Sequence, residues 1–113
     1  MIFEPFDVVV VPFPFTDSAQ TKRRPALVLS QNMFFGNVIN HSILTMITSR
    51  KNDPWPLDCE IKNRELSGLT APSVVRMKLF TLDNRFIIRR VGRLSKDDQK
   101  QVKHSLSRVF DYL

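Results

Sequence analysis

Residues 6–30 of the chain read FDVVVVPFPFTDSAQTKRRPALVLS, two apolar stretches separated by a polar one. The four valines favour a β-strand, and Pro12 and Pro14 end regular pairing there or confine it to a sheet edge. Residues 16–25 are polar and contain many turn formers, which predicts a loop. The short apolar run at 26–30 predicts a buried strand. This stretch therefore indicates a fold built on a β-sheet.

The same β pattern recurs along most of the remaining chain. It is found in NHSILTMITS (40–49), LDCEIK (57–62), SVVRMKLFTLD (73–83) and RFIIRRVGRLS (85–95). A turn is expected at 63–69, and the last of these strands is expected to turn at Gly92. The chain is thus predicted to be mostly antiparallel β, with about five to seven strands.

The C-terminal segment has the pattern of an amphipathic helix instead. Ser95 is a suitable N-cap, and Asp98 three residues later makes a capping-box variant with Asp in place of Glu. Apolar residues follow at helical spacing: Val102, Leu106, Val109, Phe110 and Leu113. We therefore expect a mainly β fold of the α+β class, a small antiparallel barrel closed by one C-terminal helix. The length of the chain predicts that residues 1–113 form a single domain.

The net charge of +6 is unevenly distributed. Residues 22–51 contain five cations and no carboxylate, and residues 66–96 contain seven cations against Asp83 alone. If the fold brings these two segments together, they form one positive face. An excess of basic over acidic residues is by itself only weak evidence that a protein binds nucleic acid.

Several classes of function find no support in the sequence. His41, Cys59 and His104 match no zinc-binding spacing, and no glycine-rich phosphate loop is present, so we expect no metal and no cofactor. Cys59 lies between Asp58 and Glu60, which would raise the pKa of its thiol and favour a structural role.

The single cysteine permits no internal disulfide, which is typical of a reducing compartment. The longest apolar run, 8–15, is short and interrupted by prolines, so no membrane span is expected. The N-terminus lacks the basic region of a signal peptide. We therefore expect a cytoplasmic protein.

The remaining candidates for chemistry are cations, hydroxyls and one amide: Ser18, Gln20, Lys22, Arg23, Arg24, Thr48, Ser49, Arg50, Arg76 and Lys78. Arg24 stands out because the following Pro25 restricts its backbone to extended conformations. A guanidinium on a stiffened backbone loses less entropy when it binds a phosphate. Lys22 and Arg23 are expected to contribute mainly general electrostatic attraction.

A set of this kind suits RNA better than DNA. The 2′-hydroxyl of RNA can attack the adjacent phosphorus, so the protein needs only to position the atoms and stabilise the developing charge. Arginine and threonine side chains can do both.

The blocks DVVVVPFPFTD, RRPALVLS, MITS, GLTAPSVVRMKLFTLD and VGRLS closely resemble the PemK/MazF toxins of bacterial toxin–antitoxin systems. The resemblance implies an SH3-like or CcdB-like barrel, usually a homodimer. It also implies a metal-independent, sequence-selective endoribonuclease that acts on single-stranded RNA and leaves a 2′,3′-cyclic phosphate and a 5′-hydroxyl.

Carried over by position, the resemblance implies that Arg24 and Thr48 are the catalytic pair and that Arg76 also acts at the phosphate. Ser18 and Gln20 match the RNA-facing loop of the family. The remaining candidates, Lys22, Arg23, Ser49, Arg50 and Lys78, are assigned to RNA binding. The general base is unassigned, because some members carry histidine in place of Ser18 and aspartate in place of Lys78.

The resemblance also implies a cognate antitoxin whose acidic, partly disordered segment covers the active face, and promoter DNA as a ligand of the toxin–antitoxin complex only. The alternative is a non-catalytic barrel of the same fold: a gyrase-directed poison, a nucleic-acid binder or a decayed toxin. The gyrase-directed relatives lack the arginine–proline step with its paired Thr-Ser, so Arg24 and Thr48 favour the enzyme.

Overall fold

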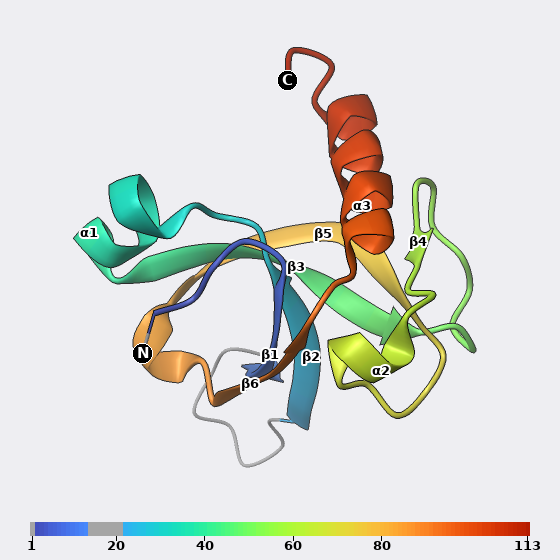
Figure 1. The fold of residues 1–113 in the computed structure, drawn as a ribbon, viewed down its shortest axis with the longest axis horizontal. Coiled ribbons are helices and arrows are strands. Elements are labelled where there is room, and N and C mark those ends of the chain that lie inside the picture. The colour runs from blue at the N-terminus through green and yellow to red at the C-terminus, as the bar shows by residue number, and fades with distance from the viewer. Residues whose placement is uncertain (1, 14–21) are drawn as a thin grey trace.

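The computed structural model describes residues 2–13 and 22–113, and within them six strands form one antiparallel sheet. The strands are β1 (Asp7–Phe13), β2 (Lys22–Val28), β3 (His41–Ser49), β4 (Cys59–Glu60), β5 (Ser73–Asp83) and β6 (Arg89–Arg93), in the spatial order β4-β5-β3-β2-β1-β6. The sheet is strongly curled, and the long helix α3 (Lys96–Val109) lies beside β5 and β4 (Figure 1). The expected mainly β barrel with a C-terminal helix is confirmed.

Alternation along the strands divides the buried side chains between two apolar clusters. Val9 and Val11 of β1 belong to one cluster, with Leu44 of β3. Val8 belongs to the other, where it packs with residues of β2 and β3 and with Val102 of α3. The helix therefore covers one face of the sheet.

Helix α3 begins as predicted but ends earlier than its apolar pattern suggested. The Ser95 hydroxyl accepts a hydrogen bond from the Asp98 backbone N–H at 3.2 Å, which confirms the cap. The Asp98 carboxylate itself accepts hydrogen bonds from the backbone N–H groups of Lys62 and Asn63. These bonds tie α3 to the segment after β4. The helix stops at Val109, which leaves Leu113 beyond it and exposed.

Several parts of the predicted organisation are wrong. Residues 22–25 belong to β2 and not to a loop, because each of them pairs with a residue of β1. Residues 63–69 contain the short helix α2 (Arg64–Ser67), capped by the Asn63 side chain. The strand predicted over 85–95 is shorter, because its first residues belong to the 3-10 helix η2 (Asn84–Phe86). No pattern predicts an element at 32–39, where the structure has η1 (Asn32–Gly36) and α1 (Asn37–Ile39).

Gly92 does not turn the chain but lies within β6, where α2 approaches it closely. A Cβ atom at Gly92 would lie 2.4 Å from the carbonyl of Ser67. Gly68 ends α2 with φ of +76°, and a Cβ there would lie 2.1 Å from the carbonyl of Val91. The two glycines allow α2 and β6 to pack backbone against backbone, and this contact positions the segment that follows Gly68.

No helix among the described residues is long and apolar enough to cross a membrane.

We predict that Gly92→Ala lowers the free energy of unfolding by about 1–3 kcal/mol, because the new methyl group overlaps a backbone carbonyl that cannot move independently. Urea denaturation measures the change. Gly36→Ala is the matched control, because its closest neighbour would be 3.2 Å away, and it should cost less. Equal losses in the two variants would contradict the role of the α2–β6 contact.

A second prediction concerns Cys59, which is 7% exposed and lies 3.0 Å from the Ser105 hydroxyl of α3. Burial raises the pKa of the Cys59 thiol, and the charges of Asp58 and Asp98 raise it further. The thiol of the unfolded chain therefore ionises at a lower pH, and stability is lost as the pH rises above about 9. Denaturation at several pH values should give a steeper alkaline loss for the wild type than for Cys59→Ala; equal slopes would contradict the prediction.

Candidate functional site

The site begins where β2 and β3 separate. Their ladder pairs Ala26 with Met46 and stops there, although both strands continue. The next residue of β2 is Pro25, which has no N–H to donate. If the register of this ladder were continued, Arg24 would stand opposite Thr48. On its other side Arg24 pairs with β1, so its backbone is still held by the sheet.

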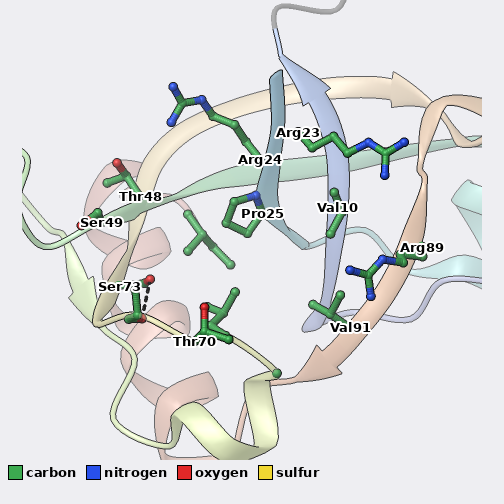
Figure 2. A pocket seen from close by; sticks show the side chains of 14 residues that line it. Val10, Arg23, Arg24, Pro25, Thr48, Ser49, Thr70, Ser73, Arg89 and Val91 are labelled. Carbon is green, nitrogen blue, oxygen red and sulfur yellow. Dashed lines mark hydrogen bonds between the residues drawn. The ribbon is translucent and has the colours of Figure 1, made fainter. Parts of the chain in front are cut away.

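Two hollows adjoin this gap and share Arg24, Ile47 and Thr48. The first, which we call the large groove, has a volume of about 480 Å³ and is shown in Figure 2. Its other lining residues are Val10, Arg23, Pro25, Ser49, Gly68, Leu69, Thr70, Ala71, Ser73, Arg89 and Val91. The second, the small pocket, has a volume of about 210 Å³. It is completed by Phe13, Met46, Trp55, Arg76 and Lys78.

The two hollows are cationic. Arg23 and Arg89 line the groove, Arg76 and Lys78 line the small pocket, and Arg24 contributes to both. Among the residues that the structure describes, no carboxylate lines either one. The fold thus brings the two positive segments of the sequence to one place, where an anion would find several cationic partners.

Arg23 and Arg24 leave β2 in opposite directions, as expected for neighbours on a strand. In Figure 2 Arg24 extends on the same side of β2 as Thr48, whereas Arg23 extends on the side of Arg89. Pro25 follows them along β2, lies below both in this view and lines the groove. Arg24 and Thr48 are therefore the two predicted catalytic residues that face the gap together.

A bulge in β5 brings Arg76 and Lys78 to the small pocket. Between Thr45 and Ile47 of β3 the register shifts, so that residues 76–78 of β5 face a single residue of β3. The fully buried Thr45 hydroxyl spans the bulge, donating to the carbonyl of Arg76 and accepting from the N–H of Lys78 at 3.1 Å. Arg76 and Lys78, two residues apart in β5, lie on the same face of the strand and both line the small pocket.

The Arg76 guanidinium is engaged within the protein. It donates to both Asp58 carboxylate oxygens, at 3.0 and 3.2 Å, and to the carbonyl of Asp53 at 2.7 Å. The pair is nearly buried, with 11% of the Arg76 and 13% of the Asp58 side chain exposed. The guanidinium carbon of Arg76 also lies 4.9 Å from the centre of the Trp55 ring. The predicted contact of Arg76 with a phosphate would therefore compete with its hydrogen-bonded ion pair to Asp58.

The hydroxyls at the end of β3 have local partners. The Thr48 Oγ1 atom accepts a hydrogen bond from the Asn52 side-chain amide at 2.6 Å, and the Ser49 hydroxyl accepts from the Lys51 N–H at 3.2 Å. Because Thr48 accepts from Asn52, its own hydroxyl hydrogen is left to be donated elsewhere.

The other predicted residues are less central. Lys22 is exposed at the start of β2 and lines neither hollow. Arg50 also lines neither, and forms an exposed ion pair with Glu60 at 3.1 Å. The Lys78 ammonium lies 5.2 Å from the centre of the Phe13 ring. Ser18 and Gln20 lie outside the described residues.

Among the lining residues that the sequence patterns do not predict are an arginine and an aromatic residue. Arg89 reaches the groove because β6 pairs with β1, a long-range arrangement that no local pattern reveals. Trp55 has a local signal, since it lies between two prolines in DPWP (53–56), which restrict the backbone around it.

The chain matches the model of a known protein family. The family model of the PemK-like, MazF-like toxin of type II toxin–antitoxin systems matches residues 4–110. The chain therefore belongs to this toxin family. A search of curated proteins found no significant match.

Solved structures share the fold. A MazE–MazF complex from Deinococcus radiodurans has a TM-score of 0.77 and 21% identity, with 98% of each chain covered. The Mycobacterium tuberculosis toxin MazF-mt6 has a TM-score of 0.73 and 18% identity, with 93% of this chain and 96% of that one covered. An endoribonuclease in complex with its cognate antitoxin, from a mycobacterial species, has a TM-score of 0.74 and 12% identity over 97% of this chain and 94% of its own. At such identities the likeness shows the fold.

We predict that Asp58→Asn lowers the free energy of unfolding by about 3 kcal/mol, because it leaves the nearly buried Arg76 guanidinium without its counter-charge. Urea denaturation measures the loss. Glu60→Gln is the matched control: it removes the same charge from an exposed pair and should cost less than about 1 kcal/mol. A loss for Asp58→Asn no greater than that of the control would contradict the structural role of the Arg76–Asp58 pair.

Proposed function

We propose that this toxin is a metal-independent endoribonuclease that cleaves single-stranded RNA where Arg24 faces Thr48. The observation that carries the proposal is that two cationic hollows, with no carboxylate among their described lining residues, meet at this pair. Membership of the PemK-like, MazF-like family supports the same activity, as does the endoribonuclease among the solved structures of this fold.

The reaction suits the groups at hand. The RNA 2′-oxygen attacks the adjacent phosphorus, the bond from phosphorus to the 5′-oxygen breaks, and the products are a 2′,3′-cyclic phosphate and a 5′-hydroxyl. A proton leaves the 2′-hydroxyl and another reaches the 5′-oxygen. Between these events the phosphoryl oxygens carry extra negative charge, which preorganised donors stabilise.

Arg24 and Thr48 supply these donors. The Arg24 guanidinium, on a backbone held by β1 and restricted by Pro25, binds the scissile phosphate with two N–H groups. The Thr48 hydroxyl donates its hydrogen to a phosphoryl oxygen, oriented by the amide of Asn52. Arg76 holds the small pocket together more than it binds the phosphate, because Asp58 neutralises its charge.

A single strand fits this surface better than a duplex does. The two hollows differ in size and share Arg24 and Thr48, so successive nucleotides can enter them separately. Only unpaired nucleotides can be splayed in this way. Arg23 and Arg89 bind the backbone in the large groove, with Ser49 beside them, and Lys78 does so in the small pocket, while Lys22 and Arg50 add general attraction. The different linings of the two hollows favour selectivity for sequence.

We further propose a cognate antitoxin as the partner in the cell, because two of the solved structures of this fold are complexes with an antitoxin. Its acidic segment would cover the cationic hollows, favoured by the net charge of +6 on the toxin. A homodimer, a cytoplasmic location and binding of promoter DNA by the toxin–antitoxin complex complete the proposal.

Incubation of the purified protein with a long RNA in the presence of EDTA tests the activity. We expect fragments with cyclic-phosphate ends from the wild type. Removal of a donor to the developing charge should lower the cleavage rate by about 100- to 1000-fold for Arg24→Ala and for Thr48→Ala. Lys100→Ala, an exposed cation on α3, is the matched control and should cut at the wild-type rate.

Each other outcome is decisive in its own way. Activity that disappears on chelation excludes the metal-independent mechanism. Equal cleavage by the wild type and Arg24→Ala overturns the site. Absence of cleavage of any RNA, with retained antitoxin binding, leaves the non-catalytic barrel as the function.

A further inference from the structure

Trp55 lies in the small pocket beside the proposed cleavage position. Its side chain lines the pocket together with Arg24 and Thr48, and the residue is 44% exposed. It belongs to the segment between β3 and β4, at some distance in sequence from either strand. An aromatic ring that faces a cationic pocket offers an apolar surface next to a phosphate-binding group.

The backbone around Trp55 is rigid. Pro54 and Pro56 flank it and restrict the chain on both sides. The Asp58 carboxylate accepts from the Trp55 N–H at 2.9 Å, and the Asp58 N–H donates to the Trp55 carbonyl at 3.3 Å. Leu57 completes the turn with φ of +68°. The ring therefore needs little ordering when a ligand binds it.

Arg76 braces the ring from β5. Its guanidinium carbon is 4.9 Å from the ring centre, and the same guanidinium is bound to Asp58 and to the Asp53 carbonyl. One arginine thus links the ring, the turn that carries it and the bulged strand β5. This gives the Arg76–Asp58 pair a function beyond stability, since it fixes the position of Trp55 relative to Arg24.

We propose that the Trp55 indole is the platform on which a nucleobase of the RNA stacks, next to the phosphate held by Arg24. The inference rests on the proposed function and adds to it a base subsite. A nucleotide satisfies both parts of the pocket, because its phosphate meets the cations and its base meets the ring. Stacking on an aromatic side chain is a general means of binding unpaired bases and tolerates different bases.

Trp55 is the only tryptophan of the chain, so indole fluorescence, excited at a wavelength that Tyr112 does not absorb, reports on this ring alone. The probe is a short single-stranded DNA of mixed sequence, which has no 2′-hydroxyl and is not cut. The control ligand is an abasic strand with the same number of phosphates, at the same ionic strength. We expect the base-bearing strand to quench the fluorescence and the abasic strand to leave it nearly unchanged. Equal quenching by both, or binding without quenching, overturns the proposal.

Variants extend the test through the anisotropy of a labelled probe. Trp55→Ala should bind the base-bearing strand about 5- to 100-fold more weakly and the abasic strand equally well. Trp55→Phe keeps a ring and should lose no more than a few-fold. Phe34→Ala removes an 81% exposed ring that lines neither hollow and should bind as the wild type does. Circular dichroism establishes that each variant is folded. Equal binding by Trp55→Ala and the wild type overturns the platform.

The outcome is separable from that of the cleavage assay. RNA cleavage without base-dependent quenching leaves the nuclease in place and overturns the platform. Base-dependent quenching without cleavage of any RNA leaves the platform and overturns the nuclease. Quenching by an acidic peptide but by no oligonucleotide overturns the base subsite and assigns the ring to a protein partner.

Discussion

The candidate site depends on one missing hydrogen-bond donor. Pro25 interrupts the ladder between β2 and β3, and the two strands part just as each presents a polar side chain to the other. With an ordinary residue at position 25, the ladder would have a donor with which to continue toward Arg24 and Thr48. The proline thus does two things: it stiffens Arg24, as the sequence suggests, and it accounts for the end of the ladder at the gap beside which the hollows lie.

Around this opening, buried polar contacts do the positioning. The Thr45 hydroxyl holds the bulge of β5, and Asp58 holds Arg76 against the turn that carries Trp55. Both contacts are largely removed from water, so they are weakly screened and geometrically demanding. The rim of the site is therefore organised by the same interactions that stabilise the sheet, and its cations reach solvent from fixed backbones.

Much of the fold could be predicted from the sequence, because alternation and helical spacing directly express which side chains are buried. The bounds of β3 and β5 and the cap at Ser95 follow from such local patterns. Local patterns did not predict that residues 22–25 belong to a strand, because a proline and three cations are unusual in a strand that continues into the core. They are tolerated there because β2 has a partner on one side only at that end.

For the site, the resemblance to the family predicts that Arg24 and Thr48 act together, and both residues line the two hollows. The contributions of Arg89 and Asp58 could not be predicted, since each arises from contacts between segments far apart in the chain. Local patterns record burial and turns, but they do not record which loop a bulged strand meets.

The location of the opening also bears on how such proteins diverge. The side chains that face the hollows come mostly from strand ends and connections. Of the two apolar clusters, the one that contains Val8 and Val102 reaches the hollows through Ile47, and the one that contains Val9 and Leu44 lines neither. A change at a residue that lines only one hollow leaves the other hollow and the cluster with Val9 and Leu44 intact. Solved structures with as little as 12% identity share this architecture, so the curled sheet tolerates replacement of most of its side chains.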